Sequence, residues 1–152
     1  MITLTPYEHM AKFEIGLEMG LLSLEELRRF LTRQLRSADV PYIYTDVYLS
    51  IDKGEEEVIN AIFYQLQGNY VPDRSTDSVV RRSLIGAIRS KWDLGQITTA
   101  QCVGFLEKLN DYFTADLSCA AIGEYYRLNQ SGAYSDRDFS AMLGSILMQG
   151  IM

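Results

Sequence analysis

Hydrophobic residues recur every three or four positions along most of the chain, which is the spacing of one face of an α-helix. The pattern predicts an all-α fold of about eight helices. The stretch Tyr42-Ile43-Tyr44 also has strand-like character, so the third segment is the one where a strand is an alternative. The predicted helices cover residues 6–19, 24–35, 43–51, 55–67, 77–93, 99–111, 115–129 and 136–149.

A sequence pattern of helix stop, turn and helix start occurs twice, at an offset of 75 positions. Each copy has a glycine suited to a left-handed helix end, then Ser or Thr three residues before Glu or Gln, the pattern of a capping box. The corresponding positions are Gly20 and Gly95, Ser23 and Thr98, Leu27 and Cys102, and Phe30-Leu31 and Phe105-Leu106. We expect a single domain over residues 1–152, built as a stack of helical hairpins from two similar four-helix halves at about 5–68 and 77–149. Independent hairpins that obey the same capping rules are the alternative.

The helical spacing also predicts which side chains are buried. In the first helix it places Glu14 and Glu18 in solvent. In the fourth helix we expect a buried group made of Val58, Ile59, Ile62, Phe63 and Leu66.

Composition and charge narrow the classes of partner. The 152 residues are 47% hydrophobic and 22% charged, which is ordinary for one folded globular domain. The net charge of -6 argues against general binding to nucleic acid or to anionic membranes and favours a basic partner. With no signal-peptide pattern at the N-terminus and no apolar window long enough to span a membrane, we expect a cytoplasmic protein.

Recognisable catalytic and metal-binding patterns are missing from the sequence. His9 is the single histidine, and Cys102 and Cys119 lack the CxxC spacing of zinc and dithiol sites. No phosphate-binding glycine loop or nucleophile elbow is found, so we expect no catalytic residues, no metal and no cofactor. The arginines at 28, 29, 33 and 36 would follow phosphates if they shared one groove, but acidic neighbours such as Glu25 favour pairing within the chain.

The acidic residues are concentrated in one stretch. Residues 39–57 carry six acidic side chains against Lys53 alone, and three tyrosines lie in the same stretch. Exposed tyrosine is enriched at interface hot spots, so this stretch is the predicted partner-binding site. The alternatives are tyrosines that cover the edge of the core, and glutamates that stabilise the start of a helix. The predicted site residues are Tyr42, Tyr44, Asp46, Tyr48, Asp52, Glu55, Glu56 and Glu57.

A small, acidic, helical chain with these tyrosines resembles the immunity proteins of bacterial contact-dependent inhibition and related polymorphic toxin systems. The segment Phe13 to Leu22 is also similar in rhythm to the start of an uncharacterised helical bacterial family, over about the first third of the chain. The resemblance implies a protein that binds one cognate toxin domain, basic and commonly a nuclease, and carries over no individual residue. A helical-repeat adaptor or regulatory scaffold is the second interpretation, and an unrecognised enzyme is the third.

Overall fold

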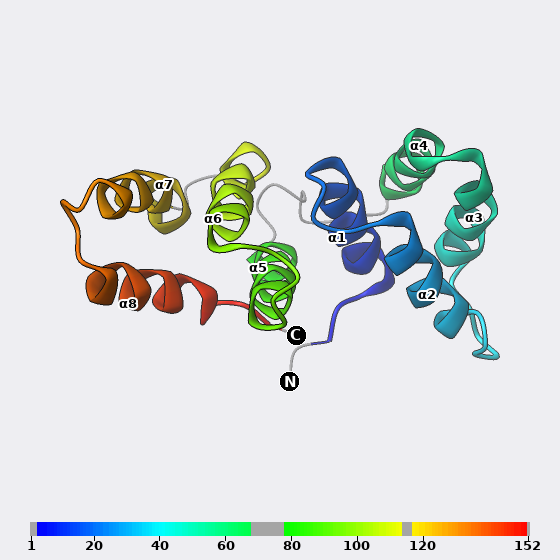
Figure 1. Cartoon of the computed structure of the whole chain (residues 1–152). Coiled ribbons are helices and arrows are strands. Elements are labelled where there is room, and N and C mark those ends of the chain that lie inside the picture. Colours follow the sequence, from blue (N-terminus) through cyan, green and yellow to red (C-terminus); the bar gives the residue numbers. More distant parts are fainter. Residues whose placement is uncertain (1–2, 68–77, 114–116, 152) are drawn as a thin grey trace. The chain divides into compact units, whose positions relative to one another are not determined.

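The computed structural model describes residues 3–67, 78–113 and 117–151, and this part of the chain contains helices and no strand (Figure 1). The predicted all-α class is confirmed, and the strand-like residues at 42–44 begin a helix. Predicted helix positions 77, 115 and 116 lie outside the described residues. The helices are α1 (Pro6–Glu18), α2 (Leu24–Gln34), α3 (Tyr42–Ser50), α4 (Glu55–Leu66), α5 (Ser78–Asp93), α6 (Thr99–Lys108), α7 (Leu117–Gln130) and α8 (Asp136–Leu147), with the 3-10 turns η1 (Ile51–Lys53) and η3 (Leu109–Asp111).

The starts of α1, α2 and α6 lie where the capping patterns predict. Thr98 accepts a hydrogen bond from the Gln101 backbone at 3.1 Å, and the Gln101 side chain accepts one from the Thr98 backbone at 2.8 Å. Thr5 begins α1 with the same capping box, and the Ser23 hydroxyl accepts from the Glu26 backbone at the start of α2. These bonds satisfy backbone donors that have no partner inside a helix, so the local sequence fixes the helix starts.

Residues 1–74 form one compact unit, which contains α1 to α4. In this unit α4 packs against α1 and α3, and α3 also contacts α1 and α2. Since α1 has neighbours on several sides, every residue from Phe13 to Leu17 is buried. Glu14 is among them, so its predicted position in solvent is wrong.

Residues 75–152 form a second compact unit, which contains α5 to α8. Here α6 packs against α5 and α7, and α8 packs against the same two helices. The C-terminal segment lies on α5, because the Ile151 N–H donates to the Arg82 carbonyl at 3.0 Å and Arg82 Nε donates to the Gln149 carbonyl at 3.0 Å.

Several local features recur in both units. Gly20 and Gly95 have positive φ values of 77° and 71°, as a left-handed helix end requires. The ring of Phe30 contacts three other rings, whereas Lys108 Nζ lies over the ring of Phe105. Common capping rules would give the same glycine conformation without duplication, so the internal repeat and the single domain stay predictions.

Candidate functional site

The tyrosine-rich stretch is helical because its apolar residues recur at helical spacing. Ile43, Val47 and Ile51 are buried along one stripe that runs from α3 into η1. Pro41 precedes the helix at the N-cap, where its missing N–H costs nothing. The stripe fixes which sides of α3 face the core and which face outward.

Tyr44 belongs to the core, and its predicted role as an exposed contact residue is wrong. Its side chain is 4% exposed and meets the ring of Phe30 edge to face at 5.6 Å. Burial raises the pKa of the Tyr44 hydroxyl to about 12. A helix advances 100° per residue, so Tyr44 lies beside the stripe of Ile43 and Val47 on the side that α2 covers.

The predicted line of Tyr44, Tyr48 and Asp52 therefore runs along the α2 side of α3. Tyr48 is 37% exposed at the edge of this contact. The Asp52 side chain is exposed and accepts a hydrogen bond from Arg28 Nη2 of α2 at 3.1 Å. The ion pair takes up part of the charge that Asp52 was expected to offer a partner.

The opposite side of α3 faces α4. Gln65 of α4 donates to Asp46 Oδ2 at 3.1 Å and thereby links the two helices. Tyr42 is 70% exposed, and Leu49 is exposed to a similar degree. Two large side chains on α3 are therefore accessible beside a carboxylate that is already oriented by a hydrogen bond.

Three glutamates occupy the first turn of α4. Glu55, Glu56 and Glu57 are exposed, and within the described residues none of them forms an ion pair. Gly54 precedes them with φ 107° and supplies no side-chain cap. Negative charge at a helix start is favourable by about 0.3–1 kcal/mol per residue, so these glutamates have a structural role whether or not they meet a partner.

Two aromatic residues of α4 that the predicted site omitted are also exposed. Phe63 was expected in the core but is 48% exposed, and Tyr64 is 71% exposed. Their rings meet edge to face, with centroids 6.0 Å apart. The exposure of Phe63 could have been predicted from the sequence, because Phe63 lies about 100° around the helix from the stripe of Val58, Ile62 and Leu66.

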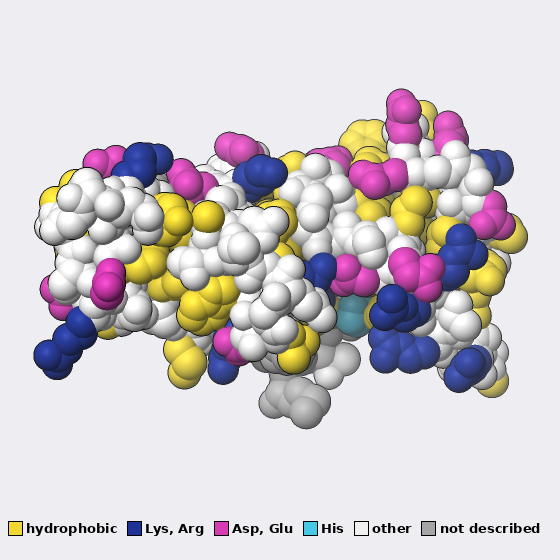
Figure 2. Space-filling view, viewed as in Figure 1, with side chains coloured by type: hydrophobic (Ala, Val, Ile, Leu, Met, Phe, Trp, Pro, Cys, Tyr) yellow, Lys and Arg dark blue, Asp and Glu magenta, His cyan; other side chains and the backbone are white. Residues whose placement is uncertain are grey.

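Exposed acidic and apolar side chains thus gather on α3, η1 and α4, and Figure 2 shows them over these elements. We call this set the α3–α4 surface. It consists of the exposed residues Tyr42, Tyr48, Leu49, Asp52, Glu55, Glu56, Glu57, Phe63 and Tyr64, together with the part-buried Asp46. Among the described residues, the other exposed large apolar side chains are Leu94 and Met148.

Cys102 and His9, two residues with reactive side chains, are placed in packed surroundings. Cys102 is buried, and burial together with Asp93 raises the pKa of its thiol to about 12, which disfavours the nucleophilic thiolate. His9 is half-buried against Phe30, with ring centroids 4.7 Å apart. Burial and the nearby Lys12 lower the pKa of His9 to about 4.

Within residues 3–67, 78–113 and 117–151, no group of three or more His, Cys, Asp or Glu side chains is placed to hold a metal ion. None of the helices in these ranges combines the length and the hydrophobicity that crossing a membrane would need. Comparisons of the chain with models of protein families, with curated proteins and with solved structures found no match.

Proposed function

We propose that the chain is a non-enzymatic binding protein whose α3–α4 surface binds a basic protein partner. The observation that supports this proposal best is the combination of exposed rings and unpaired acid on neighbouring elements. Tyr42, Leu49, Phe63 and Tyr64 expose large apolar side chains there, next to the glutamates that begin α4. Exposed apolar area of this kind is typical of interaction sites.

The two kinds of side chain would have different tasks. A tyrosine that becomes buried in an interface contributes a large rigid contact with little loss of side-chain entropy, and therefore acts mainly on dissociation. Glutamates at the rim attract a basic partner over about a Debye length and act mainly on association. A helix-start role alone would explain the glutamates, but it would not explain the exposed rings.

Among binding functions, we propose neutralisation of a cognate bacterial toxin domain inside the cell. The net charge of -6 and the acidic stretch complement a basic enzyme such as a nuclease, as the resemblance to immunity proteins implies. The second candidate is a helical-repeat adaptor, which the two sets of four helices favour. Gene order distinguishes them, since an immunity gene normally follows its toxin gene directly.

The test is binding of the purified product of the gene directly upstream, measured by surface plasmon resonance. The Tyr42→Ala/Tyr64→Ala variant should lose about 2 kcal/mol of binding, roughly thirtyfold in Kd, mainly through faster dissociation. The Glu56→Lys/Glu57→Lys variant should associate more slowly, and the difference from the wild type should shrink at high salt.

Two variants serve as matched controls. Leu94→Ala/Met148→Ala removes exposed apolar side chains elsewhere, and Asp138→Lys reverses a charge in the first turn of α8. Neither should change affinity. If the tyrosine variant binds as tightly as the wild type while remaining folded, the α3–α4 surface is not the recognition site. If the upstream product does not bind the wild type at all, the toxin assignment fails.

A further inference from the structure

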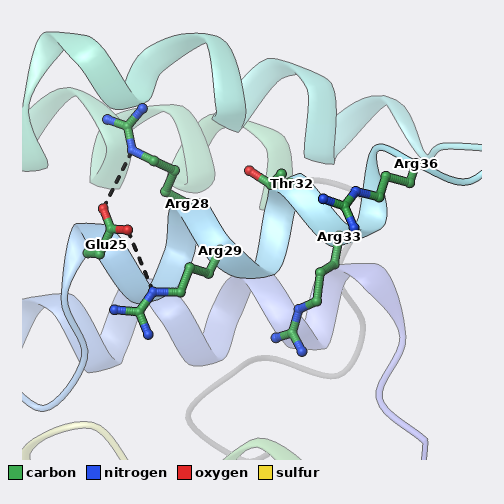
Figure 3. Close-up of a pocket in the computed structure, with 6 residues that line it drawn as sticks. All are labelled: Glu25, Arg28, Arg29, Thr32, Arg33 and Arg36. Carbon is green, nitrogen blue, oxygen red and sulfur yellow. Dashed lines mark ion pairs between the residues drawn. The ribbon is translucent and has the colours of Figure 1, made fainter.

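The exposed face of α2 carries a line of arginines. Residues 25, 28, 29, 32, 33 and 36 are separated by three or four positions, so their side chains share one face of the helix. They line one open hollow in the unit of residues 1–74, shown in Figure 3, and Figure 2 shows a cluster of basic side chains over α2. The hollow is lined by Glu25, Arg28, Arg29, Thr32, Arg33 and Arg36.

Pairing within the chain neutralises only one end of this line. Glu25 lies 3.8 Å from Arg28 and 3.6 Å from Arg29, and Asp52 lies 3.1 Å from Arg28. Within the part of the chain that the structure describes, no carboxylate lies within ion-pair distance of Arg33 or Arg36. The expected intramolecular pairing therefore holds for the first two arginines and not for the last two.

The helix dipole explains part of this arrangement. Arg33 is in the last turn of α2 and Arg36 follows the helix, where positive charge is favourable. Arg29 and Arg33, however, are like charges four residues apart, which is unfavourable on a helix surface. The buried residues Leu27 and Leu31 hold the opposite face of α2 in the core, so the arginines cannot turn inward. An anionic ligand would relieve the repulsion between them.

We propose that this hollow binds an acidic segment of a protein partner, with its carboxylates on Arg33 and Arg36. The guanidinium group matches a carboxylate with two parallel hydrogen bonds, which makes arginine the suitable residue for this contact. Arg33 and Arg36 are three positions apart, about 4.5 Å along a helix, and their long side chains can spread to the roughly 6.6 Å between alternate side chains of an extended peptide. Successive acidic side chains of one peptide face therefore reach successive arginines.

A protein segment fits the hollow better than a nucleic acid does. Glu25 lies within the hollow and only accepts hydrogen bonds, and a peptide brings backbone N–H donors to it, whereas a phosphate backbone brings none. The net charge of -6 also repels a long polyanion more than a short acidic segment. This site adjoins the α3–α4 surface at the ion pair of Arg28 with Asp52, but Arg33 and Arg36 are not part of that surface. The test below therefore does not depend on whether the α3–α4 surface binds a basic partner.

The test uses the full chain and three labelled probes in fluorescence anisotropy at about 50 mM salt. The probes are a short peptide of alternating glutamate and serine, the same peptide with glutamine in place of glutamate, and an oligothymidine of equal length. We expect saturable binding of the glutamate peptide, with weaker binding of the other two. Arg33→Gln/Arg36→Gln should lower the affinity for the glutamate peptide by at least about tenfold.

A matched variant, Arg127→Gln/Arg137→Gln, removes the same charge from the other unit and should leave binding unchanged. Arg33→Lys/Arg36→Lys keeps the positive charge but loses the paired hydrogen bonds of the guanidinium group. Its affinity for the glutamate peptide should lie between those of the wild type and of Arg33→Gln/Arg36→Gln. If Arg33→Gln/Arg36→Gln and Arg127→Gln/Arg137→Gln lose affinity equally, net charge alone explains the loss and the proposed site is overturned. Absence of saturable binding would also overturn it. Tighter binding of the oligonucleotide, lost with Arg33 and Arg36, would assign the hollow to nucleic acid instead.

Discussion

Gly86 allows the C-terminal segment to lie directly on α5. A Cβ at this position would overlap the carbonyl of Ile151, and Gly150 approaches the Gly86 backbone from the same segment. The hydrogen bond from Ile151 to Arg82 depends on this close approach. Gly104 in α6 is different, since a Cβ there would meet nothing within 4 Å.

Gly86→Ala should therefore destabilise the protein, while Gly104→Ala should stabilise it. Alanine is favoured over glycine in a helix by about 1 kcal/mol, and at position 104 nothing offsets this gain. At position 86 displacement of the tail should cost about 1–3 kcal/mol, in the range of overpacking. Urea denaturation of both variants measures the difference, and a more stable Gly86→Ala protein would contradict the close approach.

His9 has its pKa lowered to about 4, first by burial and then by Lys12. The folded chain therefore binds this proton less readily than the unfolded chain, whose histidine titrates near 6.5. The neutral ring contributes its full stability above pH 6.5, and that contribution is lost progressively as the pH falls from about 6.5 to about 4. Partial exposure of the ring reduces the size of the loss.

The pKa of His9 is directly measurable by proton NMR, because it is the single histidine of the chain. We expect its ring signals to titrate near 4 rather than near 6.5. Urea denaturation at pH 7 and at pH 5 gives the stability that each protein loses between these pH values. The loss should be smaller for His9→Gln than for the wild type, because both proteins have the same carboxylates and differ only in the histidine. A ring that titrates at 6.5 would show that burial does not disfavour its charged form.

At the scale of single elements, the capped helix starts are set by a few neighbouring residues. The capping boxes at Thr5 and Thr98 form because the side chain of residue i and that of residue i+3 reach each other's backbone N–H. Such contacts need no distant partner. They are accordingly the features that sequence predicts most accurately.

Thr98→Ala should destabilise the chain by about 1 kcal/mol, because the backbone donor of Gln101 loses its acceptor. Thr98→Ser keeps the acceptor and should change stability much less. Thr32→Ala, in the exposed face of α2, removes no helix cap and should be near neutral or slightly favourable. Thermal denaturation of the three variants tests this order, and equal losses for the alanine and serine variants at 98 would contradict the role of the cap.

At the scale of the whole molecule, the chain divides between residues 74 and 75 into two compact units. The described residues of each unit contain four α-helices and buried apolar side chains of their own. We expect fragments 1–74 and 75–152 to fold separately, although chains of this size bury a smaller share of their surface and are only marginally stable. Circular dichroism should show helical fragments with cooperative thermal transitions. If a fragment becomes helical only when the other is added, the units depend on each other for folding.

The exposure that was expected for individual side chains on α3 and α4 is only partly confirmed. Helical spacing identifies the centre of a buried stripe but not its width, because the width depends on which neighbours cover the flanks. Tyr44 was expected outside and is covered by α2, whereas Phe63 was expected inside and is left uncovered. Exposure of Tyr42, Glu56 and Glu57 follows from their positions away from the stripe, and was predictable.

The sequence by itself determined the helical class, the helix starts and the buried stripes, since these depend on residues within about four positions of one another. Only the tertiary structure decided the pairing of Arg28 with Asp52, which are 24 positions apart, and left Arg33 and Arg36 without such a partner among the described residues. Burial of Glu14 was decided in the same way. Both depend on how helices distant in sequence are packed, and a helix's own periodicity contains no information on its neighbours.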